Sequence, residues 1–243
     1  MVAQDPTVAR HDGRRRSGFH DLVHYCPRRD HGRPGHCRGL AVFCPGCLIV
    51  PWVKNGVGAV ATQAMVNPML GPAILQRLED GQPVTVALDG SWKTDSGSSL
   101  RQVHAMAMNG DAAAHTGNDC IDWCGHIGDI DISVAGNMLV GGDVLRACVD
   151  AFNTQTALPF SDRLLASLLA GDGVGGDKRG RQSAVLKIHS TEIYADWDIR
   201  VDDHPDAPNE LARIFAIGQG AFGTFKQLIH ILQLLQVPPL LKS

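Results

Sequence analysis

The sequence predicts an α+β protein, in which antiparallel strands and paired helices occupy separate stretches of the chain. Asn109-Gly110 lies between two short apolar runs, and this dipeptide is typical of a two-residue β-hairpin turn. Two amphipathic segments, 143–152 and 161–169, follow each other closely and indicate neighbouring helices. Strands and helices do not alternate regularly, so a Rossmann arrangement is not expected.

In the first half of the chain, turn residues separate a few short elements. A strand of small residues is expected at 57–63, and a proline-containing turn follows at 67–68. A helix is expected over 71–81, because a proline occupies its first turn and a glycine ends it. Residues 83–100 are expected to form a loop after a short element, because their last part is rich in Ser and Gly.

In the second half, strands at 102–108 and 112–117 flank the hairpin turn. Further strands are expected at 132–139, 183–188 and 199–201, and a last helix at 209–217. The apolar tail after Gly218 is compatible either with an extra helix or with an error of reading frame.

Composition limits the classes of function. The chain has 243 residues, of which 44% are hydrophobic and 19% charged, and its net charge is −3. This charge argues against a nucleic-acid partner, and no run of about 18 apolar residues predicts a membrane span. No signal peptide is visible, so a cytoplasmic location is expected. Seven cysteines, an odd number, argue against a full disulfide framework.

The first 47 residues differ from the rest. They hold eight arginines, no lysine and four aspartates, a local charge of +4 against −7 for the remainder. They also contain five of the eleven histidines and four of the seven cysteines, and no strand or helix pattern precedes Leu40. The cysteines and histidines are zinc-type ligands, and a zinc-binding N-terminal module is one interpretation; Cys44 and Cys47 supply its one regular pair. A disordered basic tail is another.

Two motifs are candidates for substrate binding. The loop 175–183 combines glycines, which let backbone N–H groups approach an anion, with Arg179 and Arg181, whose guanidinium groups grip carboxylates. Its alternative is a solvated basic loop. Asn137 puts an amide in an apolar strand, where it either lines a site or pins a loop.

A third motif places His115 and Thr116 side by side. Neighbours on a strand point to opposite faces, so the two cannot both enter one pocket unless the strand ends there. A partly buried structural histidine is the alternative. The acidic run 202–206 is better explained as a turn before the last helix than as a metal site.

Six stretches in order resemble those of the domain-of-unknown-function family DUF1028. They are 50–63, 67–72, 113–117, 134–139, 175–183 and 200–205, and the resemblance runs from about Ile49 to about Phe215. It implies a four-layer αββα sandwich of the Ntn-hydrolase (N-terminal nucleophile) type. In such enzymes an N-terminal Thr, Ser or Cys attacks an amide carbonyl, and its own α-amine serves as the base. Members of the family resemble this pattern by starting Met-Thr-Phe-Ser-Ile.

This chain departs from that pattern, because Val2 follows Met1. Codons for residues 20–27 can be read in the next frame as Met-Thr-Leu-Ser-Ile-Ile-Ala-Arg, which is similar to the family's start. A frameshift near Cys44–Ile49 therefore explains the arginine excess, the cysteine cluster and the missing periodicity together. On this hypothesis the first two strands are missing or scrambled, and the chain as written is inactive and unstable because unpaired strand edges remain.

The sequence thus predicts three parts: a frameshifted or disordered segment at 1–48, an Ntn-hydrolase-like domain at 49–217 and an apolar tail at 218–243. The predicted function is hydrolysis of an amide-type bond in a small molecule. No metal or cofactor is expected, and the prediction is compatible with a homo-oligomer. The candidate catalytic residues are Asn67, His115, Asn137 and Asp177, and the candidate substrate-binding residues are Arg179 and Arg181. A non-catalytic protein that binds a small anion or carboxylate through the same loop is the alternative.

Overall fold

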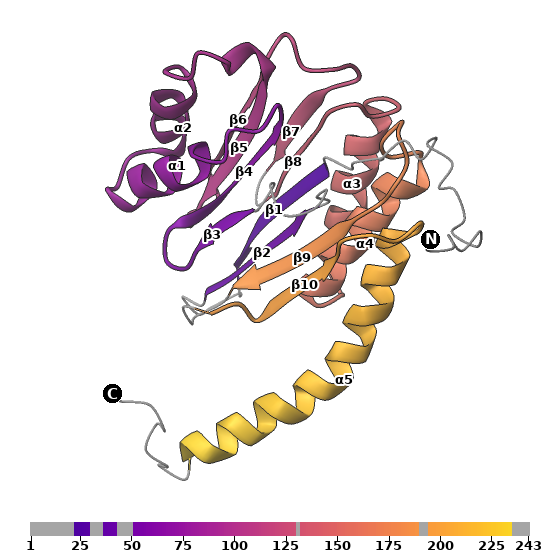
Figure 1. The fold of residues 1–243 in the computed structure, drawn as a ribbon. Helices are drawn as coiled ribbons and strands as arrows, with labels where there is room; N and C mark the ends of the chain where they lie inside the picture. The colour runs from indigo at the N-terminus through magenta and orange to yellow at the C-terminus, as the bar shows by residue number, and fades with distance from the viewer. Residues whose placement is uncertain (1–21, 30–35, 43–50, 130–131, 190–193, 235–243) are drawn as a thin grey trace, which may run out of the picture.

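The computed structural model describes residues 22–29, 36–42, 51–129, 132–189 and 194–234. Side chains are described for 51–129, 132–189 and 194–221. In these parts two antiparallel sheets lie against each other, and helices lie against both (Figure 1). The predicted α+β class is therefore confirmed.

The smaller sheet has the strand order β3-β4-β5-β6. Its strands are β3 (Trp52–Lys54), β4 (Gly58–Ala64), β5 (Arg101–Ala107) and β6 (Ala112–Thr116). Alternate residues face opposite sides. Val60 and Val103 pack among the residues of the neighbouring helices. Ala59 and Met106 instead pack against Val185 of the other sheet. The predicted strands and the hairpin turn between β5 and β6 are confirmed.

Two helices, α1 (Leu70–Glu79) and α2 (Val84–Trp92), cover the outer face of this sheet. The first was predicted, and Gly81 (φ +82°) follows its end. The second is the short element that was expected before the loop within 83–100, and the structure identifies it as a helix. Val84, Ala87 and Leu88 have helical spacing and are all buried, and this apolar contact outweighs the low helix propensity of the Gly and Ser that follow.

The larger sheet has the order β10-β9-β2-β1-β8-β7. Its strands are β1 (Leu22–Arg29), β2 (His36–Val42), β7 (Gly125–Asp129), β8 (Ile132–Gly136), β9 (Ala184–His189) and β10 (Trp197–Val201). The first two strands were expected to be missing or scrambled. They are not missing, because β1 and β2 occupy the middle of this sheet. β1 pairs with β8, and β2 pairs with β9, so backbone hydrogen bonds hold both strands in the sheet. Such hydrogen bonds form without an alternating pattern of apolar side chains, and the sequence pattern therefore did not predict these strands.

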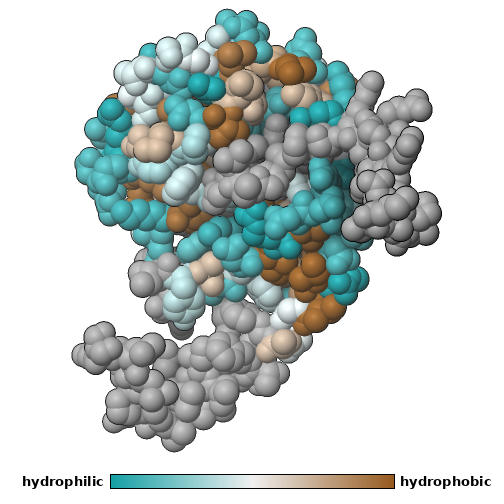
Figure 2. All heavy atoms as spheres, viewed as in Figure 1, coloured by the Kyte–Doolittle hydropathy of each residue, from teal (hydrophilic) through white to brown (hydrophobic). Residues whose placement is uncertain are grey.

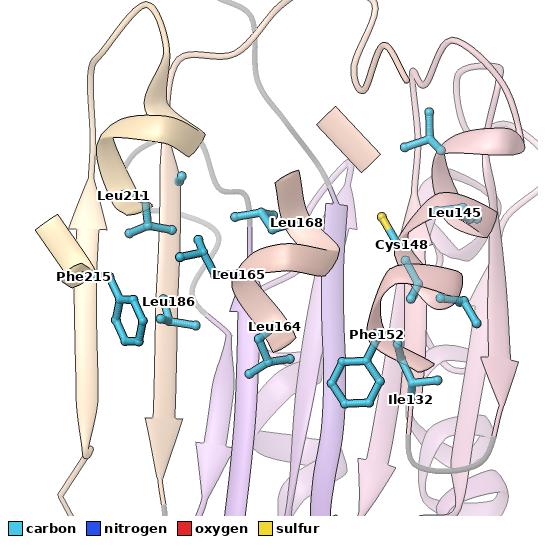
Figure 3. Close-up of a cluster of buried hydrophobic side chains, with 14 of the residues drawn as sticks. Ile132, Leu145, Cys148, Phe152, Leu164, Leu165, Leu168, Leu186, Leu211 and Phe215 are labelled. Atoms are coloured by element: carbon cyan, nitrogen blue, oxygen red, sulfur yellow. The ribbon is translucent and has the colours of Figure 1, made fainter. Parts of the chain in front are cut away.

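Three helices cover the other face of the larger sheet: α3 (Asp143–Thr154), α4 (Phe160–Gly173) and α5 (Ala207–Leu234). Their apolar side chains meet those of β8, β9 and β10 in the main core (Figure 3). Phe152, Leu164 and Phe215 are among its fully buried members. The core thus holds α3 and α4 against the larger sheet, which contributes one part of the site described below.

The last helix is longer than the predicted 209–217, since it continues to Leu234 and extends away from the body (Figure 1). Trp197 of β10 packs edge-on against Phe215, with ring centroids 4.9 Å apart. In the part of the chain that the structure describes, no helix is long and apolar enough to cross a membrane. Hydrophilic residues cover much of the described surface on the face shown in Figure 2.

Candidate functional site

Three buried amide side chains gather at one edge of the two sheets. Gln63 lies near the end of β4, Gln102 near the start of β5, and Asn137 directly after β8; each is 0% exposed. We call these three residues the amide cluster. Strand register explains the meeting, because Gln63 pairs with Gln102, and Gln102 with Thr116, on the face that looks toward the larger sheet.

Hydrogen bonds of the amide cluster join the two sheets. The Nε2 of Gln102 donates to the carbonyl oxygens of Gly125 at 2.9 Å and Gly136 at 3.0 Å. Its Oε1 accepts from Gln63 Nε2 at 2.6 Å and from Asn137 Nδ2 at 3.3 Å. Carbonyls only accept, so they fix which end of the Gln102 amide is nitrogen. Gln102 therefore holds both of its neighbours in defined orientations.

This arrangement leaves a buried acceptor. With its Nδ2 directed at Gln102, Asn137 has its Oδ1 on the other side, and within the described part of the chain that oxygen has no hydrogen-bond partner. A buried polar atom without a partner costs about 1–3 kcal/mol. Such an atom at 0% exposure is a candidate for contact with a ligand or a reacting group.

The backbone next to the cluster is unusual. Ala64 (φ 65°) follows Gln63, and Met138 (φ 56°) follows Asn137. Among the described residues these are the two non-glycine residues with a left-handed backbone. That conformation is costly for a residue with a Cβ and tends to occur where function constrains the chain. Both bends thus mark the same edge of the sheets.

The start of a central strand lies at this edge. Leu22, the first residue of β1, pairs with Gly136, the last residue of β8 and the neighbour of Asn137. Gln102 donates to the carbonyl of the same glycine. The N-terminal end of β1 is therefore adjacent to the amide cluster.

Asp177 lies nearby, on the loop after α4. Its backbone bridges Leu139, and the next residue's N–H donates to the carbonyl of Met138 at 2.9 Å. Its carboxylate is 3% exposed and accepts from Arg179 Nε at 3.0 Å and from the backbone N–H of Arg179 at 2.7 Å. Asp177 and Arg179 therefore neutralise each other beside the segment after β8 that contains Asn137.

Arg181 has a different position. Its guanidinium forms ion pairs with Asp172 of α4 and, at 3.2 Å, with Asp206 just before α5. Burial raises the pKa of Asp172, against the opposing effect of Arg181. Both candidate substrate-binding arginines thus already contact carboxylates of this chain.

Asn67 and His115 lie on the far side of the smaller sheet from the amide cluster. His115 pairs with the outward-facing Val103, stacks on Trp92 at 3.7 Å between ring centroids, and contacts the carbonyl oxygen of Ser98 through Nε2 at 2.9 Å. Its neighbour Thr116 faces inward, as the alternation of a strand predicts.

Asn67 instead supports the turn before α1. Its Nδ2 donates to Asp95 Oδ2 at 2.7 Å. Hydrogen bonds from Arg101 and then from Asn67 lower the pKa of Asp95 to about 2. The structure therefore places Asp177 beside Leu139, two residues after Asn137. Asn67 and His115 lie on the other side of the smaller sheet, and Arg181 pairs with Asp172 and Asp206.

Sequence reasoning missed Gln63 and Gln102. The available signal was a polar side chain at the end of an otherwise apolar strand, the same signal that identified Asn137. The zinc-type residues proposed in the first 47 positions lie outside the side chains described here. Among those that are described, no group of three or more His, Cys, Asp or Glu could hold a metal ion.

The model of a family of unknown function (DUF1028) matches residues 39–211, starting earlier than the predicted Ile49. The structure is similar to the crystal structure of SPO2555 from Silicibacter pomeroyi, described with the same family model, with 28% identity and a TM-score of 0.69 over 81% of this chain and 88% of that one.

A second similar structure is Anbu (ancestral beta-subunit) from Yersinia bercovieri, with 10% identity and a TM-score of 0.40 over 91% of this chain and 100% of that one. No curated protein matches the chain.

Proposed function

Because this chain belongs to DUF1028, a family of unknown function, as its six sequence stretches predicted, we propose a function from its candidate site: hydrolysis of an amide bond by an N-terminal nucleophile. The proposal includes the finer fold, a four-layer αββα sandwich of the Ntn-hydrolase type. The two facing sheets, with helices on both outer faces, are compatible with it.

One observation carries the proposal. The first residue of central strand β1, Leu22, pairs with Gly136, beside the buried amide cluster. An N-terminal nucleophile enzyme needs its first residue at a strand end that opens into a polar, water-poor site. In the shifted reading frame a Thr stands at position 21, immediately before this strand.

The chemistry requires few groups. The threonine hydroxyl attacks the amide carbonyl carbon, and its proton passes to the α-amine of the same residue. Backbone N–H groups or Asn137 stabilise the oxygen that becomes negative. The α-ammonium then protonates the leaving amine, and the C–N bond breaks, which leaves the acyl group as an ester of the threonine. The α-amine next takes a proton from a water molecule that attacks this ester. The ester C–O bond breaks, the threonine hydroxyl regains its proton, and the carboxylic acid leaves. Asn137 and Gln102 would shape this site, and the substrate would be a small-molecule amide.

The test compares the frame-corrected protein with its Thr→Ala variant at the N-terminus, using a panel of small amides. We expect the frame-corrected protein to hydrolyse amides at a rate at least about 10³-fold higher than that of the Ala variant, since an alanine supplies no nucleophile. Equal rates for the two proteins would contradict the proposal. Carboxylate binding without catalysis is less favoured, because Arg179 and Arg181 already pair with Asp177, Asp172 and Asp206.

A further inference from the structure

A cavity lies between α1 and α2, which run side by side over the outer face of the smaller sheet (Figure 1). Its volume is about 260 Å³. At about 30 Å³ for each water-sized group, it holds a molecule of fewer than about ten non-hydrogen atoms. Met69 and Ala73 form an apolar part of its wall, and Arg77, Ser91 and Thr94 form a polar part. Such a mixed lining is typical of a site for a small polar molecule.

Arg77 supplies the positive charge of this cavity. Its guanidinium is partly buried, its Nη2 donates to the carbonyl oxygen of Gly90 at 3.1 Å, and its Nη1 lies 3.5 Å from Gln82 Oε1. Among the side chains that the structure describes, no carboxylate forms an ion pair with it. A guanidinium has five N–H donors, so these two contacts leave donors for a ligand.

The other arginines with described side chains have their partners within the chain. Most form ion pairs with carboxylates: Arg101, Arg146, Arg179, Arg181, Arg200 and Arg213. Arg163 instead donates twice to the carbonyl oxygen of Phe152. Asp95 also lines the cavity, but Arg101 neutralises it at 3.1 Å. The uncompensated charge of Arg77 therefore favours an anion in the cavity.

Gly90 makes room for the guanidinium. A Cβ at this position would lie 2.9 Å from Nη1 and 3.1 Å from Cζ of Arg77, which is closer than such atoms normally approach. Glycine is unfavourable in the interior of a helix, and Gly90 lies inside α2. The missing side chain thus lets Arg77 lie against the α2 backbone at the wall of the cavity.

We propose that this cavity is a binding site for a small carboxylate, whose two oxygens accept hydrogen bonds from the Arg77 guanidinium. Paired hydrogen bonds of this kind are short and strong because both partners are charged. The inference does not depend on the proposed function, since the cavity lies on the opposite side of the smaller sheet from the amide cluster.

Two hydroxyls narrow the class of ligand. Ser91 Oγ donates to the carbonyl oxygen of Ala87 at 2.9 Å, and Thr94 Oγ1 donates to that of Ser91 at 2.9 Å. Since each hydroxyl has used its single proton, both oxygens can only accept from a ligand. A carboxylate that also carries an O–H or N–H group suits this wall. The class is therefore a hydroxy acid or amino acid of about three or four carbon atoms.

The test is a titration of the full-length, ¹⁵N-labelled protein with sodium L-lactate at constant ionic strength, followed by NMR at the amide signals of Gly90 and Ser91. Lactamide, which has nearly the same shape without the charge, is the control ligand. We expect a saturable shift with lactate, with a Kd of about 1 mM, and binding of lactamide at least about 10-fold weaker. No saturable shift with lactate, or equal affinity for the two ligands, would overturn the proposal.

Three variants show whether Arg77 is responsible. Arg77→Lys keeps the charge but loses the paired donors, so it should weaken lactate binding at least about 10-fold. Gly90→Ala keeps Arg77 but crowds its guanidinium. It should weaken binding without lowering the melting temperature, because alanine favours a helix. Arg146→Gln, at an exposed arginine of α3, is the matched control and should leave the affinity unchanged. The same affinity in Arg77→Lys as in the unchanged protein would mean that Arg77 only caps α2, and would overturn the site.

Discussion

Replacing Gln102 with leucine tests the amide cluster most severely. Gln102→Leu keeps a similar volume but removes the donor for the carbonyls of Gly125 and Gly136 and the acceptor for Gln63 and Asn137. Each buried polar group that loses its partner costs about 1–3 kcal/mol. Because neighbouring groups can relax, we expect the low end of the sum, a loss of about 4 kcal/mol in the free energy of unfolding.

Urea unfolding of the purified protein measures this loss, provided that the slope against denaturant stays unchanged. Gln76→Leu is the matched control, since Gln76 is exposed on α1 and donates only to Asp80 Oδ1, at 3.0 Å. It should change the free energy of unfolding by no more than about 0.5 kcal/mol. A loss below about 1 kcal/mol for Gln102→Leu would refute the assignment of Gln102 as the group that holds the cluster together.

Other contacts give predictions of their own. Asp95→Asn should cost about 2 kcal/mol at pH 7, because hydrogen bonds from Arg101 and then from Asn67 lower the pKa of Asp95 from 3.8 to about 2. This stabilisation is complete above pH 3.8 and is lost as the pH falls through 2. The free energies of unfolding of the unchanged protein and of Asp95→Asn should therefore differ at pH 7 and become nearly equal at pH 2. Phe152→Ala should cost about 3–5 kcal/mol in urea unfolding, since Phe152 is 2% exposed in the main core. Ala64→Gly should raise the melting temperature slightly, by relieving about 0.5–1 kcal/mol of left-handed strain; a decrease would contradict it.

Local patterns predicted the elements that have a strong signal of their own. The hairpin of β5 and β6 follows from Asn109-Gly110, and α3 and α4 follow from their helical apolar spacing. The short element expected before the loop within 83–100 is α2, and its type was not predicted because its apolar stripe of Val84, Ala87 and Leu88 is short. Strands β1 and β2 have no pattern to detect, since their places are set by the backbones of β8 and β9.

The candidate site was harder to predict, because its parts come from strands far apart in the sequence. Asn137 could be found as an amide in an apolar strand, but its partner Gln102 is 35 residues away and lies in the other sheet. His115 and Asn67 carry suitable chemistry, yet strand alternation and the turn before α1 place them on the other side of the smaller sheet. The inner or outer face of each strand decides which polar residues meet, and that depends on register.

The most direct test of the account is the intact mass and N-terminal residue of the protein isolated from its natural source. We predict a chain that lacks residues 1–20 and begins with a free threonine directly before Leu22, the residue that pairs with Gly136. A protein that retains the first 20 residues as written would contradict an N-terminal nucleophile at that position. The cysteines and histidines of the first 47 residues would then call for metal analysis of the purified protein.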